Sequence, residues 1–246
     1  MMVYARRFDC RKIFRKAGLQ YENVRMLRIV SRSSESFNDR QEAGRLLGSE
    51  LKDYAGKKTV VLGVPRGGVI VASALTSVIG AELDIVLSRK LGAPGNPELA
   101  MGAIAEDGKV FLNENLLAYI GAGNNYIQEE KKHQLAEITR RVDLYRKVRP
   151  KVSLKGRIVI ITDDGLATGA TMQAAVLAVR QESPEKLIVA VPVAPGETLE
   201  KLESDADEIL CLQAPAFFAA VGEFYKSFKQ ITDEEVLAVL REKGVS

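Results

Sequence analysis

Residues 158–171 decide the fold and read Ile-Val-Ile-Ile-Thr-Asp-Asp-Gly-Leu-Ala-Thr-Gly-Ala-Thr. The aliphatic run at 158–161 is typical of a central parallel strand that is covered on both faces. Asp163 and Asp164 follow at its carboxyl end, where open α/β sheets place their ligands. The small residues after them, and an apolar helix expected from about Met172, can direct backbone N–H groups at one anion. A phosphate held beside two carboxylates suggests a sugar phosphate, with the acids accepting hydrogen bonds from ribose hydroxyls.

This stretch resembles the 5-phosphoribosyl-1-pyrophosphate (PRPP) binding signature of type I phosphoribosyltransferases (PRTases). The aliphatic strand, the acid pair Asp163–Asp164 and the loop with Thr168-Gly169 and a closing Thr171 occur without a gap. The resemblance implies that the acids bind the ribose hydroxyls and that the loop binds the 5-phosphate. The loop residues concerned are Ala167, Thr168, Gly169, Ala170 and Thr171. An ordinary strand, turn and helix with a polar cap is the alternative interpretation.

A second loop, Gly63-Val64-Pro65-Arg66-Gly67-Gly68, also lies between an expected strand and an expected helix. Gly67 and Gly68 permit close approach of an anion to the backbone, and Arg66 can bind phosphate oxygens in a forked geometry. The loop is similar to the pyrophosphate-binding loop of the same family. The alternative is a plain βα turn with an exposed arginine.

Cations recur at Ser88-Arg89-Lys90, ahead of a Gly/Pro-rich segment, 91–97, that is expected to be a loop. Type I PRTases, which this chain resembles, carry a mobile loop here. The resemblance implies that Arg89 and Lys90 bind the departing diphosphate and help to exclude water. A solvated charged turn is the alternative.

The remaining pattern alternates strands with helices, which predicts parallel βαβ units with right-handed crossovers. We therefore expect an α/β fold of the type I PRTase kind, with a central mostly parallel twisted sheet flanked by helices and a small hood or flap. Glu106-Asp107-Gly108 predicts a hairpin between 100–104 and 109–112. Further strands are expected at 59–64, 84–88, 187–193 and 207–212, and helices at about 39–51 and 69–79.

A long charged helix is predicted from about Tyr126 to Lys147, because apolar residues recur at intervals of three and four. We take it as a helical insertion, about 123–150, in a single domain that spans 37–246. Residues 1–36 hold nine basic and three acidic residues, so they carry a net charge of +6 in a chain whose net charge is only +3. We predict a poorly ordered basic extension there; a transit peptide, or translated sequence upstream of a start at Met26, are the alternatives.

Bulk properties exclude several other classes of protein. The 246 residues are 46% hydrophobic and 27% charged, as in an ordinary soluble α/β domain, and the body is mildly acidic, so nucleic acid is not an expected partner. Cys10 and Cys211 lack metal-ligand spacing and suit a reducing compartment, and no apolar run could span a membrane, so we expect a cytoplasmic protein. No P-loop or dinucleotide motif occurs, and the single histidine, His133, is expected at the surface.

The resemblance implies transfer of 5-phosphoribosyl from PRPP to a nitrogenous base or related amine, with Mg²⁺ carried on the diphosphate rather than in a protein cage. Ala167 stands where hypoxanthine–guanine enzymes carry an aspartate, which disfavours their way of holding the purine. Phe217 or Phe218 could stack on a base, but packing into the core is the favoured interpretation. The chain as a whole looks like bacterial PRTase-like proteins of unassigned substrate, which would place it in nucleotide metabolism.

Two other functions stay open. One is a regulatory protein that senses PRPP and acts on nucleic acid or on a protein partner. The other is a hydrolase of phosphorylated sugars. The cations Arg66, Arg89 and Lys90 favour catalysis, since a sensor needs no cationic lid. A homodimer is compatible with the sequence, which does not specify the oligomeric state.

Overall fold

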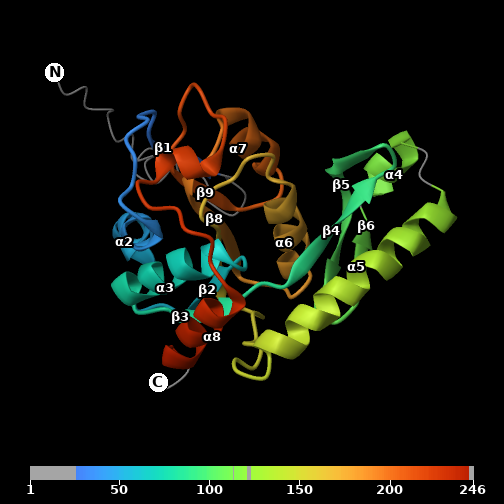
Figure 1. Ribbon diagram of the computed structural model, residues 1–246, viewed down its shortest axis with the longest axis horizontal. Helices are drawn as coiled ribbons and strands as arrows, with labels where there is room; N and C mark the ends of the chain where they lie inside the picture. The colour runs from blue at the N-terminus through green and yellow to red at the C-terminus, as the bar shows by residue number, and fades with distance from the viewer. Residues whose placement is uncertain (1–25, 113, 121–122, 244–246) are drawn as a thin grey trace, which may run out of the picture.

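A computed structural model describes residues 26–112, 114–120 and 123–243. Its centre is a six-stranded parallel sheet in the order β1-β9-β8-β7-β2-β3 (Figure 1). The predicted α/β fold with a mostly parallel sheet is confirmed. The strands are β1 (Met26–Ser31), β2 (Thr59–Gly63), β3 (Glu82–Ile85), β7 (Ile158–Thr162), β8 (Lys186–Val193) and β9 (Glu208–Gln213).

Two apolar layers cover the sheet because its central strands are apolar at nearly every position. Val61 and Ile160 face the layer built by α2 (Arg40–Glu50) and α3 (Gly67–Ile79). Val159 and Ile161 face the opposite layer, built by α6 (Ala170–Arg180) and α7 (Gly196–Leu202). Strand alternation therefore places the core on both faces and leaves the carboxyl ends of the strands free for a site.

The domain begins before Phe37, where its N-terminal boundary was predicted, because the strand β1 precedes that residue. Met26–Ser31 forms an edge strand parallel to β9, and Arg28 within it donates hydrogen bonds to the carboxylate and the backbone carbonyl of Glu50 at 3.1 and 2.8 Å. An edge strand is covered less than a central one, so its sequence carries charge and lacks the uninterrupted apolar run of the central strands β2, β7 and β8. The part of the predicted extension ahead of Met26 lies outside the described residues.

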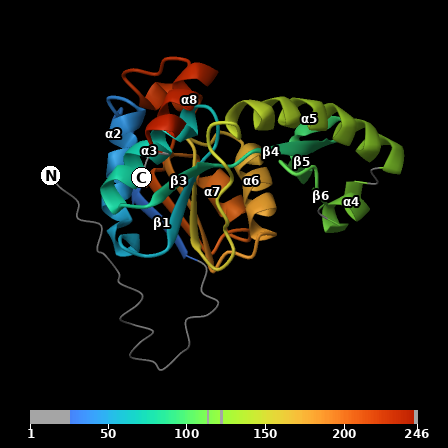
Figure 2. The same cartoon turned by 90° about the horizontal axis from the view of Figure 1, so that it is seen from below.

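An arm, residues 88–145, projects from one side of the body (Figures 1 and 2). It holds a three-stranded antiparallel sheet and two helices, with Leu91, Met101 and Ile127 in a core of its own. The elements are β4 (Ser88–Ala93), β5 (Asn96–Ala105), β6 (Val110–Leu112), α4 (Glu114–Ile120) and α5 (Asn124–Tyr145). The predicted charged helix and the predicted hairpin are confirmed. The arm is longer than the predicted insertion at 123–150. The predicted loop at 91–97 is wrong, because β4 and β5 pair there and leave only a tight turn between them.

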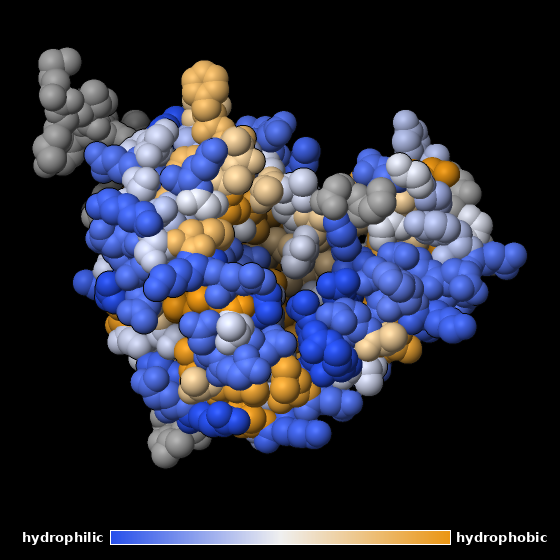
Figure 3. Space-filling view, viewed as in Figure 1, coloured by the Kyte–Doolittle hydropathy of each residue, from blue (hydrophilic) through white to orange (hydrophobic). Residues whose placement is uncertain are grey.

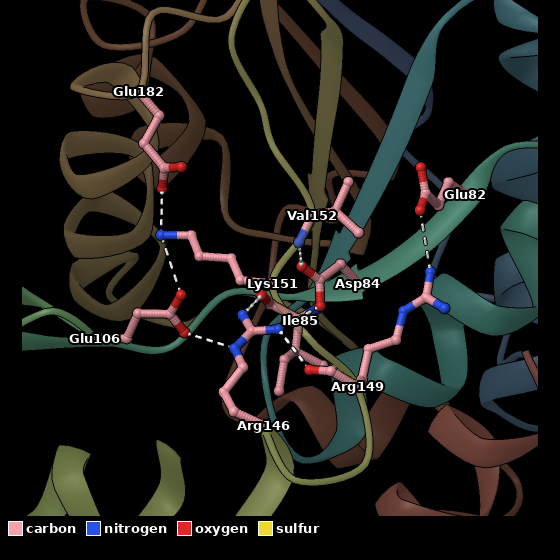
Figure 4. Close-up of polar contacts among 9 residues, drawn as sticks. All are labelled: Glu82, Asp84, Ile85, Glu106, Arg146, Arg149, Lys151, Val152 and Glu182. Carbon is pink, nitrogen blue, oxygen red and sulfur yellow. Dashed lines mark hydrogen bonds and ion pairs between the residues drawn. The ribbon is translucent and has the colours of Figure 1, made fainter. Parts of the chain in front are cut away.

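Ionic contacts fix the base of the arm to the body (Figure 4). Arg146, which follows α5, donates to Asp84 of β3 at 2.6 Å and to Glu106 of the β5–β6 turn at 2.8 Å. Lys151 joins Glu106 to Glu182 at 3.0 and 2.9 Å. Asp84 is 1% exposed, and burial raises its pKa despite the Arg146 guanidinium. These contacts set where α5 lies relative to the carboxyl ends of the strands.

The chain returns after β9 through residues 214–229, which we call the hood segment, and ends in α8 (Asp233–Glu242). The hood segment contains the short 3₁₀ helix η2 (Val221–Phe224), and another, η1 (Lys52–Tyr54), follows α2. Among the helices of the described residues, none has the length and apolar character required to cross a bilayer.

Candidate active site

The acid pair, Asp163 and Asp164, lies directly beyond β7, as predicted. The neighbouring strand β2 ends in register with it, with Gly63 beside Thr162, so the loops that follow the two strands start side by side. The Val64 amide donates to the Thr162 carbonyl at 2.9 Å and continues this pairing past the strand ends. The parallel register thus brings together two motifs that lie about a hundred residues apart in the sequence.

Gly67 and Gly68 lie in residues 65–68, which we call the diphosphate loop after the ligand expected from the sequence, and they touch the acid pair. A Cβ on Gly67 would overlap the Asp164 carboxylate and lie 2.9 Å from the Arg40 guanidinium. A Cβ on Gly68 would lie 2.8 Å from the Asp163 Cα. Glycine is therefore required at both positions, because the backbone there lies too close to Asp163 and Asp164 to leave space for a side chain.

Substitution Gly67→Ala is expected to displace the Asp164 side chain and to weaken PRPP binding at least about tenfold, since the added methyl group has no space. Gly196→Ala is the matched control, because a Cβ at Gly196 meets no atom within 4 Å. Titration calorimetry measures both. Equal PRPP affinity in the Gly67→Ala and Gly196→Ala variants would show that the close approach is unimportant for this ligand.

Residues 167–171, which we call the phosphate loop after the ligand expected from the sequence, include the start of α6 at Ala170. Gly169 adopts φ +78°, a left-handed conformation that favours glycine, and its carbonyl accepts from the Gln173 amide at 2.9 Å. Ala167 is held by Thr198 of α7, whose hydroxyl donates to the Ala167 carbonyl at 2.7 Å. Ala167, Thr168 and Thr171 are exposed at this end of the sheet. The loop is thus held by α7 on one side and exposed to solvent on the other, at the positive end of the α6 helix dipole.

Arg40 is the residue that sequence reasoning missed as part of the site. It is 7% exposed, and its Nε donates to the Asp164 carboxylate at 2.8 Å, while its Nη1 donates to the Lys229 carbonyl at 2.8 Å. Its guanidinium lies 3.9 Å from the ring centre of Phe228, in cation–π contact. A cation in the first turn of a helix opposes the helix dipole, and that mismatch was the available signal.

The two acids have different surroundings. Burial and the neighbouring Asp164 charge raise the pKa of Asp163 well above its usual range. The Asp163 carboxylate accepts from the Asp164 amide at 2.8 Å, whereas the Asp164 carboxylate is paired with Arg40. The Tyr225 hydroxyl of the hood segment donates to the Asp164 carbonyl, which holds the backbone of the pair. The two acids therefore differ in their contacts: Asp163 is held by a backbone amide and has a raised pKa, whereas Asp164 is held by an arginine.

Arg89 and Lys90 lie in β4, ahead of the tip of the β4–β5 hairpin, which occupies the place of the expected loop. Arg89 donates from Nε to the Gln134 side chain of α5 at 2.8 Å. Arg89, Lys90 and Pro65 line the same cavity, together with Thr171 of the phosphate loop. The acid pair with the phosphate loop, the diphosphate loop and the basic start of β4 therefore all lie at one end of the sheet.

Two other expectations can be compared with the structure. Phe217 is 91% exposed on the hood segment, so the favoured core position is wrong for it, whereas Phe218 is half-buried and stacks on Phe224 with ring centres 5.2 Å apart. His133 is exposed on α5, as predicted. Within the described part of the chain, no three His, Cys, Asp or Glu side chains gather as they would around a metal ion.

Comparison with known proteins gives consistent matches. Residues 33–227 match the family described as "Phosphoribosyl transferase domain". Two curated Mycobacterium tuberculosis proteins, from strains CDC 1551 and H37Rv, each carry the name "Putative phosphoribosyl transferase" and are 43% identical over 204 residues. Those matches cover 83% of this chain but 46% of each relative, so the chain spans about half the length of the curated relatives that it matches.

A solved structure is also similar over almost its whole length. The crystal structure of TT1426 from Thermus thermophilus is 47% identical in sequence, with a TM-score of 0.80. The match covers 84% of this chain and 98% of the Thermus chain. The described fold therefore has a close counterpart among solved structures.

Proposed function

The chain belongs to the phosphoribosyl transferase domain family, of the type I kind, and from this premise we propose that it transfers 5-phosphoribosyl from PRPP to a nitrogenous base or related amine. The observation that carries the proposal is the contact of the diphosphate loop with the acid pair, through Gly67 and Gly68. One ligand with a ribose between a phosphate and a diphosphate would meet both loops at once.

The proposed reaction breaks the bond from C1 to the diphosphate oxygen and forms a bond from C1 to the acceptor nitrogen. Positive charge develops on the ribose ring, much as in glycoside cleavage. Asp163 and Asp164 would bind the ribose hydroxyls, the phosphate loop would hold the 5-phosphate, and Arg66 with the amides of Gly67 and Gly68 would hold the diphosphate. The protein then acts by alignment and by stabilising charge on the leaving group.

The arm and the hood segment lie on different sides of the acid pair, and each suits a different group: the leaving diphosphate or the acceptor. The arm lies on the β3 side, where Arg89 and Lys90 meet Pro65. The hood segment lies on the other side, where Val221 is against Gly165 and Phe228 is against Arg40. An incoming nucleophile and a leaving group need opposite faces of C1. We therefore place the diphosphate toward the arm and the acceptor toward the hood segment.

The hood side favours a flat and uncharged acceptor. Phe217 presents an exposed ring that can stack on a base, and Ala167 supplies no carboxylate to a purine nitrogen. Mg²⁺ would arrive on the diphosphate of PRPP and neutralise charge on the leaving group, and Asp163 and Asp164 would be the acids that face this complex. Roles in nucleotide metabolism, a cytoplasmic location and a homodimer stay predictions.

A panel assay tests the proposal. The full chain is incubated with Mg²⁺, PRPP and a set of bases and amines, and pyrophosphate release is measured. We expect release that depends on one acceptor and that Asp164→Asn lowers about 10- to 100-fold, the value of a hydrogen bond to a charged group. Asp143→Asn on the exposed face of α5 is the matched control.

Other outcomes would identify the competing functions. Release with water alone would indicate a hydrolase of phosphorylated sugars. Tight PRPP binding without turnover of any acceptor would indicate a PRPP sensor. Unchanged activity in Asp164→Asn would contradict the ribose assignment.

A further inference from the structure

A cavity of about 130 Å³ lies between the arm and the body. Its walls come from the diphosphate loop at Pro65, from the start of β4 at Arg89 and Lys90, and from the middle of α5 at Gln134, Ile138 and Arg141. Thr171, the last residue of the phosphate loop, closes another side. Figure 3 shows the hollow between the body and the arm on the viewed face. The helix α5, which has no role in the proposed function so far, thus forms part of the site.

All three charged residues that line this cavity are basic. Arg89 is held by Gln134, whose amide in turn donates to Glu130 at 3.0 Å, and Arg141 donates from Nε to Glu137 at 3.1 Å. Glu130 and Glu137 orient the cations from outside and do not line the cavity. The charged part of the cavity wall is therefore positive.

The two guanidinium groups repel each other. Burial and the Arg141 charge lower the pKa of Arg89, against the opposite influence of Glu137 and Glu130. Like charges held close together cost free energy, and a bound anion would remove that cost.

Resting on the proposed function, we propose that α5 completes a phosphoryl-anion subsite, in which Arg141 joins Arg89 and Lys90 to bind a terminal phosphoryl group of the substrate. The cavity borders both the diphosphate loop and the phosphate loop, so the group is either the end of the diphosphate or the 5-phosphate. Arginine suits this task because its planar fork matches phosphate oxygens. The subsite gives the charged helix a function: it carries a substrate-binding cation to the site.

Titration calorimetry on the full chain tests the subsite with two probes, inorganic pyrophosphate and ribose 5-phosphate. Arg141→Ala is expected to weaken one of them at least about tenfold, and the probe affected identifies the group bound. Arg141→Lys is expected to recover part of the loss, because charge is kept and the fork is lost. Arg140→Ala is the matched control: Arg140 also contacts Glu137, at 3.2 Å, but it lies outside the cavity.

The outcomes separate this inference from the proposed function. If Arg141→Ala binds both probes like the parent, or if Arg140→Ala loses as much, the subsite is wrong even where PRPP turnover is intact. If the parent shows no transfer to any acceptor but Arg141→Ala selectively loses pyrophosphate or ribose 5-phosphate, the subsite stands and the transferase proposal falls. A thermal unfolding curve for each variant checks that the fold is retained.

Discussion

Substitution Arg40→Met is expected to lower the free energy of unfolding by about 3 kcal/mol, the low end of the cost of leaving one partner of a buried ion pair alone. Methionine keeps much of the apolar volume but removes the bonds to Asp164 and to the Lys229 carbonyl and the contact with the Phe228 ring. The Asp164 side chain, only 16% exposed, would lose its cation. Urea denaturation measures the change.

A double-mutant cycle identifies the cause of this loss. Arg40→Met in an Asp164→Asn background is expected to cost less than in the parent, because no unpaired carboxylate is then left in the site. Arg45→Met, on the exposed side of the same helix, is the control and is expected to be close to neutral. If Arg45→Met and Arg40→Met are equally mild, Arg40 does not secure the hood segment to the acid pair. PRPP affinity should fall in parallel with stability only for Arg40→Met.

Substitution Asp163→Asn is expected to lower phosphoribosyl transfer about 10- to 100-fold and, at the same time, to stabilise the fold at neutral pH. The loss of activity follows from removing a charged acceptor from the ribose site. The gain in stability follows from removing a poorly solvated charge that faces Asp164. The amide oxygen of asparagine can still accept from the Asp164 amide, so the turn is kept.

The pH dependence of this gain has a definite sign. The pKa of Asp163 is raised in the folded state, so the folded protein prefers the protonated acid. The parent is therefore penalised as the pH rises through the folded pKa, and the penalty is absent below the unfolded pKa of about 3.9. The advantage of Asp163→Asn in urea midpoint should shrink toward about pH 4. An advantage that is the same at all pH values would exclude charge as its source.

Local motifs were predictable because their physics is local. The aliphatic run at 158–161 and the glycines of the two loops specify a buried strand, close approach and a helix start within a few residues each. Their contact also followed from the parallel sheet, since carboxyl ends of neighbouring strands share one edge. The sheet, the hairpin around Gly108 and the helix α5 were accordingly confirmed by the structure.

The missed features depend on contacts between segments far apart in the sequence. Arg40 meets Asp164 across more than a hundred residues, and nothing in its own helix identifies that partner. The edge strand β1 is short, its apolar residues flank Arg28, and it is held by pairing with β9, far along the chain. Gly92 lies inside a strand because β5 pairs with it, although glycine and proline nearby predict a loop. Phe217 lies in solvent, although hydrophobicity alone favours the core.

A crystal structure of the chain with PRPP and Mg²⁺ is the most direct test of the central claim. We expect the 5-phosphate on the amides of residues 167–171, the ribose hydroxyls on Asp163 and Asp164, and the diphosphate between Arg66, Gly67 and Gly68. PRPP bound elsewhere, or bound here with its diphosphate away from the diphosphate loop, would contradict it.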